Sequence, residues 1–195
     1  SVEGVIVANI KEYLPRIARW LFSLAKEKKD GHHLYGLAVG DRWFQDVLKK
    51  FHGSKKPELE IDPASDIAIF QYTGGTTGVP KGAMSTHRAL VSNTHTMQRW
   101  LGADDVSKEL LLGAIPFFHV YGLVTLVAYA ASSGATIISV PNARDIDDVV
   151  GNLCKWRPTL FMGVPALFNA INNHQRVIDG SADISSLRVC FSGSA

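Results

Sequence analysis

The stretch that decides the fold spans residues 67–82 and reads Ile-Ala-Ile-Phe-Gln-Tyr-Thr-Gly-Gly-Thr-Thr-Gly-Val-Pro-Lys-Gly. Its first six residues are mostly apolar and rich in β-formers, and glycines follow soon after Tyr72. Such a run predicts a strand. Because glycine adopts backbone conformations that are closed to other residues, the segment after Tyr72 is expected to turn sharply and to approach a ligand closely.

Strand-like and helix-like segments alternate downstream of this stretch. Strands are expected at residues 109–115, 136–140, 159–162 and 187–191. Helices are expected at residues 87–101, with Thr86 as N-cap, and at residues 123–131, 145–156 and 166–172. The alternation predicts an α/β fold with a largely parallel sheet. Ligands of such folds bind at the carboxyl ends of strands, which selects the loops after Tyr72, Ile115 and Phe191.

One long segment without charge needs a separate interpretation. Residues 110–143 contain no Asp, Glu, Lys or Arg. This uncharged segment is long enough for a membrane span. Pro116, His119, Gly122 and Gly134 interrupt it. A strand, a loop and a helix buried in one core are therefore favoured over a span.

Residues 1–60 differ in character from residues 61–195, and the chain is divided there. The first segment is irregular and basic, with Leu14, Ile17, Trp20, Leu21 and Leu24 at helical spacing among lysines and arginines. Such a helix could lie on an anionic membrane surface. Packing on other parts of the protein, with a solvated basic face, is the favoured alternative.

Composition narrows the class of protein. A net charge of +2 is too small to argue for a nucleic-acid partner. Cys154 and Cys190 lie far apart without metal or redox spacing, so buried thiols in a reducing compartment are expected. No secretory signal pattern opens the chain, and both ends look cut, so part of a longer protein is expected.

The glycine-rich segment has the chemistry of a polyphosphate site. Its glycines let successive backbone N–H groups form a concave anion site, threonine hydroxyls add neutral donors, and Lys81 adds a full charge. A plain surface turn between a strand and a helix is the alternative. A Walker loop is rejected, because Gly82 rather than Ser or Thr follows Lys81.

Residues 73–82 closely resemble the phosphate-binding signature of adenylate-forming enzymes, which include acyl-CoA synthetases, luciferases and peptide-synthetase adenylation domains. Two more segments are similar to motifs of this superfamily, Pro116-Phe117-Phe118-His119-Val120-Tyr121-Gly122 and Gly163-Val164-Pro165. The terminal Ser192-Gly193-Ser194-Ala195 also sits where such enzymes carry a motif. Residues 72–78 with 84–88 are most similar to bacterial long- and medium-chain fatty acyl-CoA synthetases.

This resemblance implies part of the large N-terminal domain of such an enzyme, with the C-terminal domain absent from the chain. It implies ATP-dependent activation of a carboxylic acid, expected to be a fatty acid, to an acyl-adenylate and then an acyl-CoA. Magnesium is the implied metal and coenzyme A the co-substrate. The isolated chain is expected to be inactive.

The resemblance also assigns roles to residues. The ATP phosphates fall to Thr73, Gly74, Gly75, Thr76, Thr77, Gly78, Lys81 and Gly82, with magnesium near Thr73. The adenine loop begins with Ser192, Gly193, Ser194 and Ala195. The catalytic residues are His119, beside the reacting carboxylate, and Lys81. The substrate side falls to Val120, Tyr121 and Gly122 against the acyl group, and to Gly163 and Val164 along the acyl or pantetheine channel.

Several alternatives stay open at this point. His119 taken alone fits a hydrogen-bonded core histidine, and residues 163–165 fit a plain strand-to-helix turn. Asp145, Asp147 and Asp148 fit a solvated helix start better than a cation site. The other candidate functions are a non-catalytic nucleotide- or membrane-binding module, an aryl-CoA ligase and an amino-acid adenylation domain. A cytoplasmic protein is expected, with peripheral contact to the inner membrane surface and a homodimer both left open.

Overall fold

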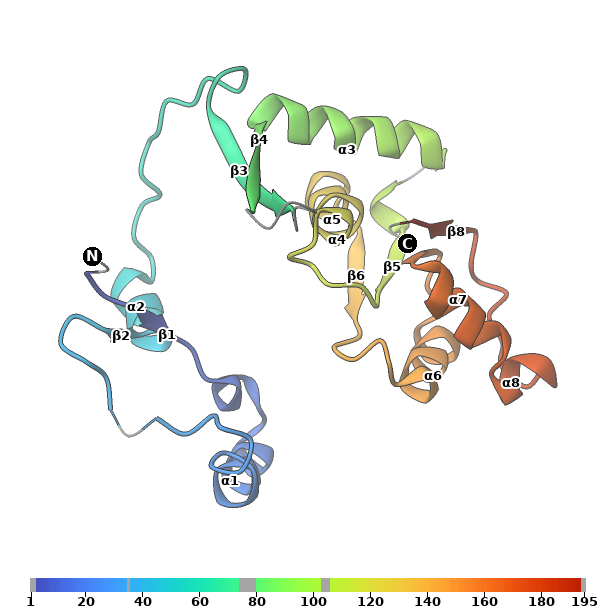
Figure 1. Ribbon diagram of the computed structural model, residues 1–195, viewed down its shortest axis with the longest axis horizontal. Helices are drawn as coiled ribbons and strands as arrows, with labels where there is room; N and C mark the ends of the chain where they lie inside the picture. The colour runs from blue at the N-terminus through green and yellow to red at the C-terminus, as the bar shows by residue number, and fades with distance from the viewer. Residues whose placement is uncertain (1–2, 35, 74–79, 103–105, 194–195) are drawn as a thin grey trace. The chain divides into compact units, whose positions relative to one another are not determined.

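The computed structural model describes residues 3–34, 36–73, 80–102 and 106–193. The chain divides into two compact units, Ser1–Leu59 and Glu60–Ala195, here called unit 1 and unit 2. Figure 1 shows their elements in sequence order from blue to red.

Unit 1 is small and pairs two short strands in parallel. Its elements are β1 (Ile6–Val7), η1 (Ile10–Tyr13), α1 (Arg16–Ala25), β2 (Arg42–Trp43) and α2 (Phe44–Phe51). The expected helix in the basic segment is thus confirmed as α1. Among the described residues of this unit, the buried ones are polar, Asn9 and Glu27. Glu27 accepts from Lys11 Nζ at 2.5 Å, which lowers the pKa of its carboxyl.

Unit 2 is built around a four-stranded parallel sheet, which confirms the predicted α/β class. The strand order is β6-β5-β7-β8. The strands are β5 (Leu110–Gly113), β6 (Thr136–Ser139), β7 (Leu160–Gly163) and β8 (Val189–Ser192), each within about two residues of the expected run. Leu111 and Leu112 of β5 and Phe161 of β7 are at most 1% exposed, because helices cover both faces of the sheet.

Helices form a layer on each side of this sheet. The first layer holds α3 (His87–Leu101), α4 (Val120–Gly122), the π-helix η3 (Leu123–Ala128) and α5 (Tyr129–Ser133). The second holds α6 (Ile146–Trp156), α7 (Pro165–Asn172) and the short α8 (Gln175–Ile178), and one 3-10 turn, η2 (Val106–Lys108), precedes β5. Figure 1 shows the sheet between α3 and α7. Leu111 packs in the cluster of the first layer and Leu112 in that of the second, as strand alternation requires.

The uncharged segment 110–143 forms β5, the helical stretch α4–η3–α5, and β6. None of the helices in the described part of the chain is long and apolar enough to cross a membrane. The expectation of a strand, loop and helix in one core is therefore confirmed.

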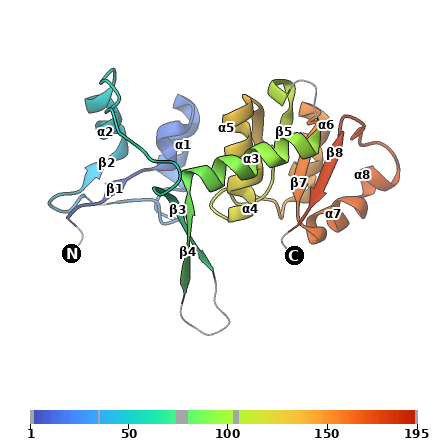
Figure 2. The ribbon, with the colours of Figure 1, turned by 90° about the horizontal axis from the view of Figure 1, so that it is seen from above.

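The strand before the glycine-rich segment lies outside the parallel sheet. β3 (Ile67–Thr73) pairs antiparallel with β4 (Lys81–Thr86), so that Thr73 lies opposite Lys81 (Figure 2). The prediction that the loop after Tyr72 lies at the carboxyl end of a strand of the parallel sheet was wrong. β4 is small, polar and mostly exposed, so its sequence lacks the apolar pattern that would have identified a strand.

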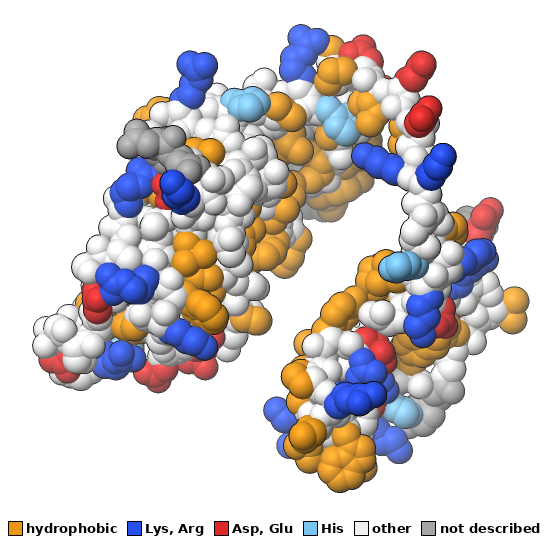
Figure 3. Space-filling model, turned by 180° about the vertical axis from the view of Figure 1, so that it is seen from behind, with side chains coloured by type: hydrophobic (Ala, Val, Ile, Leu, Met, Phe, Trp, Pro, Cys, Tyr) orange, Lys and Arg blue, Asp and Glu red, His pale blue; other side chains and the backbone are white. Residues whose placement is uncertain are grey.

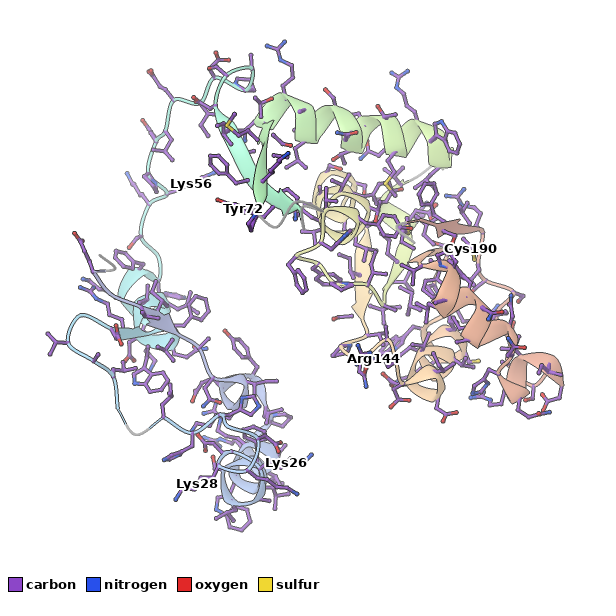
Figure 4. All side chains as sticks on the ribbon, in the orientation of Figure 1. Lys26, Lys28, Lys56, Tyr72, Arg144 and Cys190 are labelled. Carbon is purple, nitrogen blue, oxygen red and sulfur yellow. The ribbon has the colours of Figure 1, made fainter. Side chains whose placement is uncertain are left out.

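The cysteines also differ from expectation. Cys190 is exposed and Cys154 is only partly buried. β8 pairs with β7 alone among the described strands, so Cys190 lies on an edge strand and not in the interior. Figure 4 shows Cys190 on this strand.

An ion pair between the buried Glu109 and the more exposed Arg188 joins the amino ends of the parallel strands. Arg188, just before β8, donates to Glu109, which precedes β5 and is 7% exposed. The Thr159 hydroxyl, before β7, donates to the other Glu109 oxygen. Arg188 also donates to the carbonyl of Leu101, the last residue of α3, at 2.6 Å. One carboxylate and one guanidinium thus connect three strands and a helix.

Replacing Arg188 tests this connection. Arg188→Met leaves a buried carboxylate without its cation, so the free energy of unfolding of unit 2 should fall by about 2–4 kcal/mol. Urea denaturation of the 195-residue chain measures it. Arg157→Met, which breaks the exposed pair with Asp183, is the control and should have a much smaller effect. Equal losses in the two variants would contradict the structural role of Arg188.

Candidate functional site

The candidate site lies at the carboxyl edge of the parallel sheet. Residues 114–122 follow β5, residues 164–165 follow β7, and Gly193 follows β8. Because β5 and β7 are neighbours, and β7 and β8 are neighbours, these segments meet. Two of the three loops selected from the sequence, those after Ile115 and Phe191, are therefore confirmed at this edge.

A tight turn positions His119. The His119 amide donates to the Pro116 carbonyl at 3.3 Å, and the Leu123 amide donates to the His119 carbonyl at 2.8 Å. Gly122 completes the turn, since a Cβ there would lie 2.2 Å from the Pro116 carbonyl oxygen. Glycine is required at this position because no side chain fits against that backbone.

His119 caps the helix that follows it. Its Nδ1 accepts a hydrogen bond from the Tyr121 amide at 3.2 Å. A neutral imidazole that accepts at Nδ1 carries its proton on Nε2. His119 therefore has one ring nitrogen engaged by its own helix and a second, proton-bearing nitrogen available as a hydrogen-bond donor.

A cavity of about 180 Å³ opens beside this histidine. It is lined by Ile115, Pro116, His119, Tyr121, Gly122 and Val164. Four residues that the sequence assigned to the substrate side or to catalysis thus share one cavity, and they come from two strand ends. Val120 points elsewhere, into a small cavity of about 70 Å³ that it shares with Ile69 and Gln71 of β3.

Tyr121 connects the histidine turn to β7 and β8. Its hydroxyl lies 2.7 Å from the Phe191 carbonyl oxygen and 3.3 Å from that of Gly163. Burial raises the pKa of the Tyr121 phenol to about 12. The Gly193 amide donates to the same Gly163 carbonyl at 3.2 Å. The Gly163 carbonyl therefore accepts from two donors, the Tyr121 hydroxyl and the Gly193 amide.

The hairpin that carries the glycine-rich segment packs against the same helix. Ile69, Gln71 and Ser85 of the hairpin line the 70 Å³ cavity together with α3 and the α4–η3 stretch. Thr73 and Lys81 lie opposite each other where the two strands end. Gly82 lies opposite Tyr72, whose ring would be 3.3 Å from a Cβ at position 82 (Figure 4). Lys81 is thus the first residue of a strand.

Several predicted site residues lie outside the described part of the chain. They are Gly74, Gly75, Thr76, Thr77, Gly78, Ser194 and Ala195. Their assignments remain predictions, as do the roles of the described residues Thr73, Lys81 and Gly82.

Acidic side chains assemble no metal site in the ranges that the structure describes. Asp145 accepts from the Asp148 amide at 3.1 Å and so caps α6. Asp147 pairs with His174 at 2.9 Å. The expected helix start at these aspartates is confirmed. The Thr86 hydroxyl caps α3 by accepting from the Ala89 amide, and His87 is the first residue of that helix.

Sequence reasoning missed two cavities beside the site. The larger, about 460 Å³, lies at the carboxyl ends of β5 and β6, between residues 113–118 and 139–144, and includes Arg144 (Figure 4). The rule that ligands bind at strand ends would have selected residues 139–144 too, had it been applied to the strand at 136–140.

The second missed cavity is apolar and measures about 310 Å³. It lies between α3, η3 and the end of β8, and is lined by Asn93, Thr96, Met97, Trp100, Leu101, Val124, Thr125 and Phe191. In the sequence, Met97 and Leu101 only indicated a helix with an apolar face, a pattern that does not separate a core from a cavity wall.

Comparisons with known proteins identify the family of this chain. The family model described as "AMP-binding enzyme" matches residues 11–195. A long-chain-fatty-acid–CoA ligase of Bacillus subtilis is 34% identical over 198 residues, covering 100% of this chain and 34% of the relative. A ligase of the same name from Salmonella typhimurium is 37% identical over 139 residues, covering 71% of this chain and 24% of the relative.

Solved structures support the fold. The N-terminal domain of FACL13 from Mycobacterium tuberculosis matches with a TM-score of 0.67 at 24% identity, covering 88% of this chain and 42% of that one. ATP-bound MatB from Rhodopseudomonas palustris matches with a TM-score of 0.66 at 23% identity, covering 98% and 35%. The chain spans about a third of the length of the curated relative that it matches throughout. With a family model that covers nearly all of its residues, the chain belongs to the AMP-binding enzyme family.

Proposed function

We propose that this chain is part of an enzyme that uses ATP to activate a carboxylic acid and then transfers the acyl group to coenzyme A. One observation carries the proposal: the cavity that contains His119 lies at the carboxyl edge of a parallel sheet, and the hairpin bearing the glycine-rich segment packs on the same helix. Ligands of open α/β sheets bind at such an edge.

The chemistry brings two anions together. In the first step a carboxylate oxygen attacks the α-phosphorus of ATP, and pyrophosphate leaves as the acyl-adenylate forms. In the second, the coenzyme A thiolate attacks the acyl carbon and AMP leaves. Backbone N–H groups and a cation near the phosphates lower the repulsion and hold the reactants in line.

Different residues of this chain would bind the phosphates and the carboxylate. Lys81 and the backbone around it would bind the β- and γ-phosphates. The Nε2 proton of His119 would hydrogen-bond the reacting carboxylate inside the 180 Å³ cavity. A bound magnesium ion would supply positive charge to the phosphates, with the Thr73 hydroxyl as the proposed contact from this chain.

Pyrophosphate exchange into ATP tests the first step. In a full-length protein containing these residues, exchange should depend on a carboxylic acid and on magnesium, and should stop on chelation. Lys81→Ala should slow it by roughly 10- to 100-fold, because a cation that offsets phosphate charge is lost. Lys155→Ala, on α6, is the control and should exchange normally.

Two results would contradict this proposal. Absence of exchange with every carboxylic acid tried would favour the non-catalytic nucleotide-binding alternative. A normal rate for Lys81→Ala would remove the proposed role of that lysine.

A fatty acid is the substrate class that the structure favours. The 310 Å³ cavity is mostly apolar, and Phe191 in its wall lies beside Tyr121 of the His119 cavity, with ring centroids 6.2 Å apart. An acyl chain whose carboxylate lies at His119 could therefore extend past Phe191 between α3 and η3. The ligases named in the comparisons act on long-chain fatty acids by name, whereas a 4-coumarate–CoA ligase from Dictyostelium discoideum is 33% identical over 144 residues.

Filling the apolar cavity should shorten the preferred acid. Thr96→Trp adds a ring at an exposed position of its wall. The ratio of kcat/KM for long over short acids should fall roughly tenfold or more in a full-length protein. His95→Trp, one residue away and outside the cavity, is the control. An unchanged ratio for Thr96→Trp would place the acyl chain elsewhere.

Peripheral contact with an anionic lipid surface is proposed for α1. Ile17, Trp20, Leu21 and Leu24 recur at helical spacing and are 51–77% exposed. The opposite face of α1 packs on its own unit, where the Phe22 and His32 rings are 5.6 Å apart and Arg19 donates to the Lys11 carbonyl. Arg16, Lys26, Lys28 and Lys29 flank the exposed stripe. Figure 3 shows hydrophobic side chains grouped with lysines and arginines on unit 1, and Figure 4 labels Lys26 and Lys28.

Vesicle co-sedimentation of the 195-residue chain tests this contact. Binding should be stronger to phosphatidylglycerol than to phosphatidylcholine vesicles and should weaken with salt. Trp20→Glu with Leu24→Glu should weaken binding at least about tenfold, since the apolar stripe no longer enters the interface. Val39→Glu, at another exposed apolar position, is the control. Equal binding by both variants would show that the exposed stripe of α1 is not the lipid contact.

A further inference from the structure

The hydroxyl of Tyr121 lies where three strand ends meet. Tyr121 belongs to α4, which follows β5, and its hydroxyl reaches the carbonyls of Gly163, the last residue of β7, and Phe191 in β8. A phenol has one proton to donate. The distances of 2.7 Å to Phe191 and 3.3 Å to Gly163 make Phe191 the main acceptor and Gly163 the weaker one.

The surroundings of Tyr121 hold it in this place. The Thr125 hydroxyl donates to the Tyr121 carbonyl at 2.6 Å, and Thr125 lies one turn along in η3. The Tyr121 ring packs on the Phe191 ring, and a Cβ at Gly193 would lie 3.7 Å from it. The phenol, its ring and its backbone are therefore each in contact with a defined neighbour.

β8 needs such a contact because it is an edge strand in the described part of the chain. It pairs only with β7, and its residues 190–192 are exposed. Arg188 holds its amino end through Glu109. At the carboxyl end the corresponding contacts are the Tyr121 hydroxyl and the Gly193 amide, which donates to the Gly163 carbonyl. Gly193 belongs to residues 192–195, the segment that the resemblance assigns to the nucleotide.

We propose that Tyr121 is a positioning residue, whose hydroxyl holds the carboxyl ends of β7 and β8 and thereby sets Ser192 and Gly193 relative to His119. The hydroxyl is occupied by backbone carbonyls, so an acyl group in the His119 cavity meets the ring of Tyr121 and not its O–H. The kinetic consequence rests on the proposed function, whereas the structural consequence does not.

A matched control exists in the same helical layer. Tyr129 is fully buried, and its hydroxyl makes no hydrogen bond with any residue that the structure describes. Tyr121→Phe and Tyr129→Phe therefore remove the same atom, in one case from two acceptors and in the other from none.

Hydrogen exchange of the 195-residue chain tests the structural part. Tyr121→Phe should raise amide exchange in the peptide that covers residues 189–193, and leave the peptides of β5 and β6 unchanged. Tyr129→Phe should match the unsubstituted chain. Unchanged exchange at 189–193 in Tyr121→Phe would overturn the proposal. So would global unfolding of that variant, because the hydroxyl would then support the whole unit and not one edge.

Steady-state kinetics of a full-length protein test the functional part. Tyr121→Phe should raise the KM for ATP by about three- to tenfold, as expected for one net hydrogen bond, and leave the KM for the carboxylic acid unchanged. Tyr129→Phe should change neither. A rise in the KM for the acid alone would show that the hydroxyl binds the acyl substrate, which overturns the positioning role. Absence of activity in the unsubstituted protein would contradict the proposed function, and hydrogen exchange would still decide the role of Tyr121.

Discussion

The burial of β5 and β7 on both faces is the constraint on which the rest of unit 2 depends. Leu111, Leu112, Leu160, Phe161 and Met162 are at most 1% exposed, so neither strand can slip without moving its apolar side chains toward solvent. A fixed register places the ends of these strands at one level. The turn at His119 and the turn at Val164 then meet, because each directly follows one of these two neighbouring strands.

The edge strand β8 follows a different rule, because it has one neighbour and an exposed outer face in the described chain. Directional polar contacts at its two ends hold it where apolar burial does not. Arg188 and Glu109 act at the amino end, and the Tyr121 hydroxyl acts at the carboxyl end. Polar contacts depend on one atom each, so this strand is the part of the sheet most sensitive to conservative substitutions.

Sequence reasoning located the parallel strands because long apolar runs and helix caps are local signals, as at Thr86 and Asp145. It placed the loop after Tyr72 wrongly, since β4 is defined by pairing with β3 and not by its own residues. It grouped His119, Tyr121 and Val164 only through resemblance. The contact of the Tyr121 hydroxyl with a carbonyl 70 residues away has no sequence signal at all.

The His119 turn and the walls of the apolar cavity depend on different kinds of contact. The His119 turn depends on backbone contacts, above all Gly122 against the Pro116 carbonyl, where no other residue fits. The walls of the apolar cavity are side chains such as Thr96, Met97 and Trp100 on an exposed helix, which can change without disturbing that turn. If the proposed function holds, substitutions in this cavity wall should alter the acid that the protein accepts while the position of His119 relative to β7 and β8 stays constant.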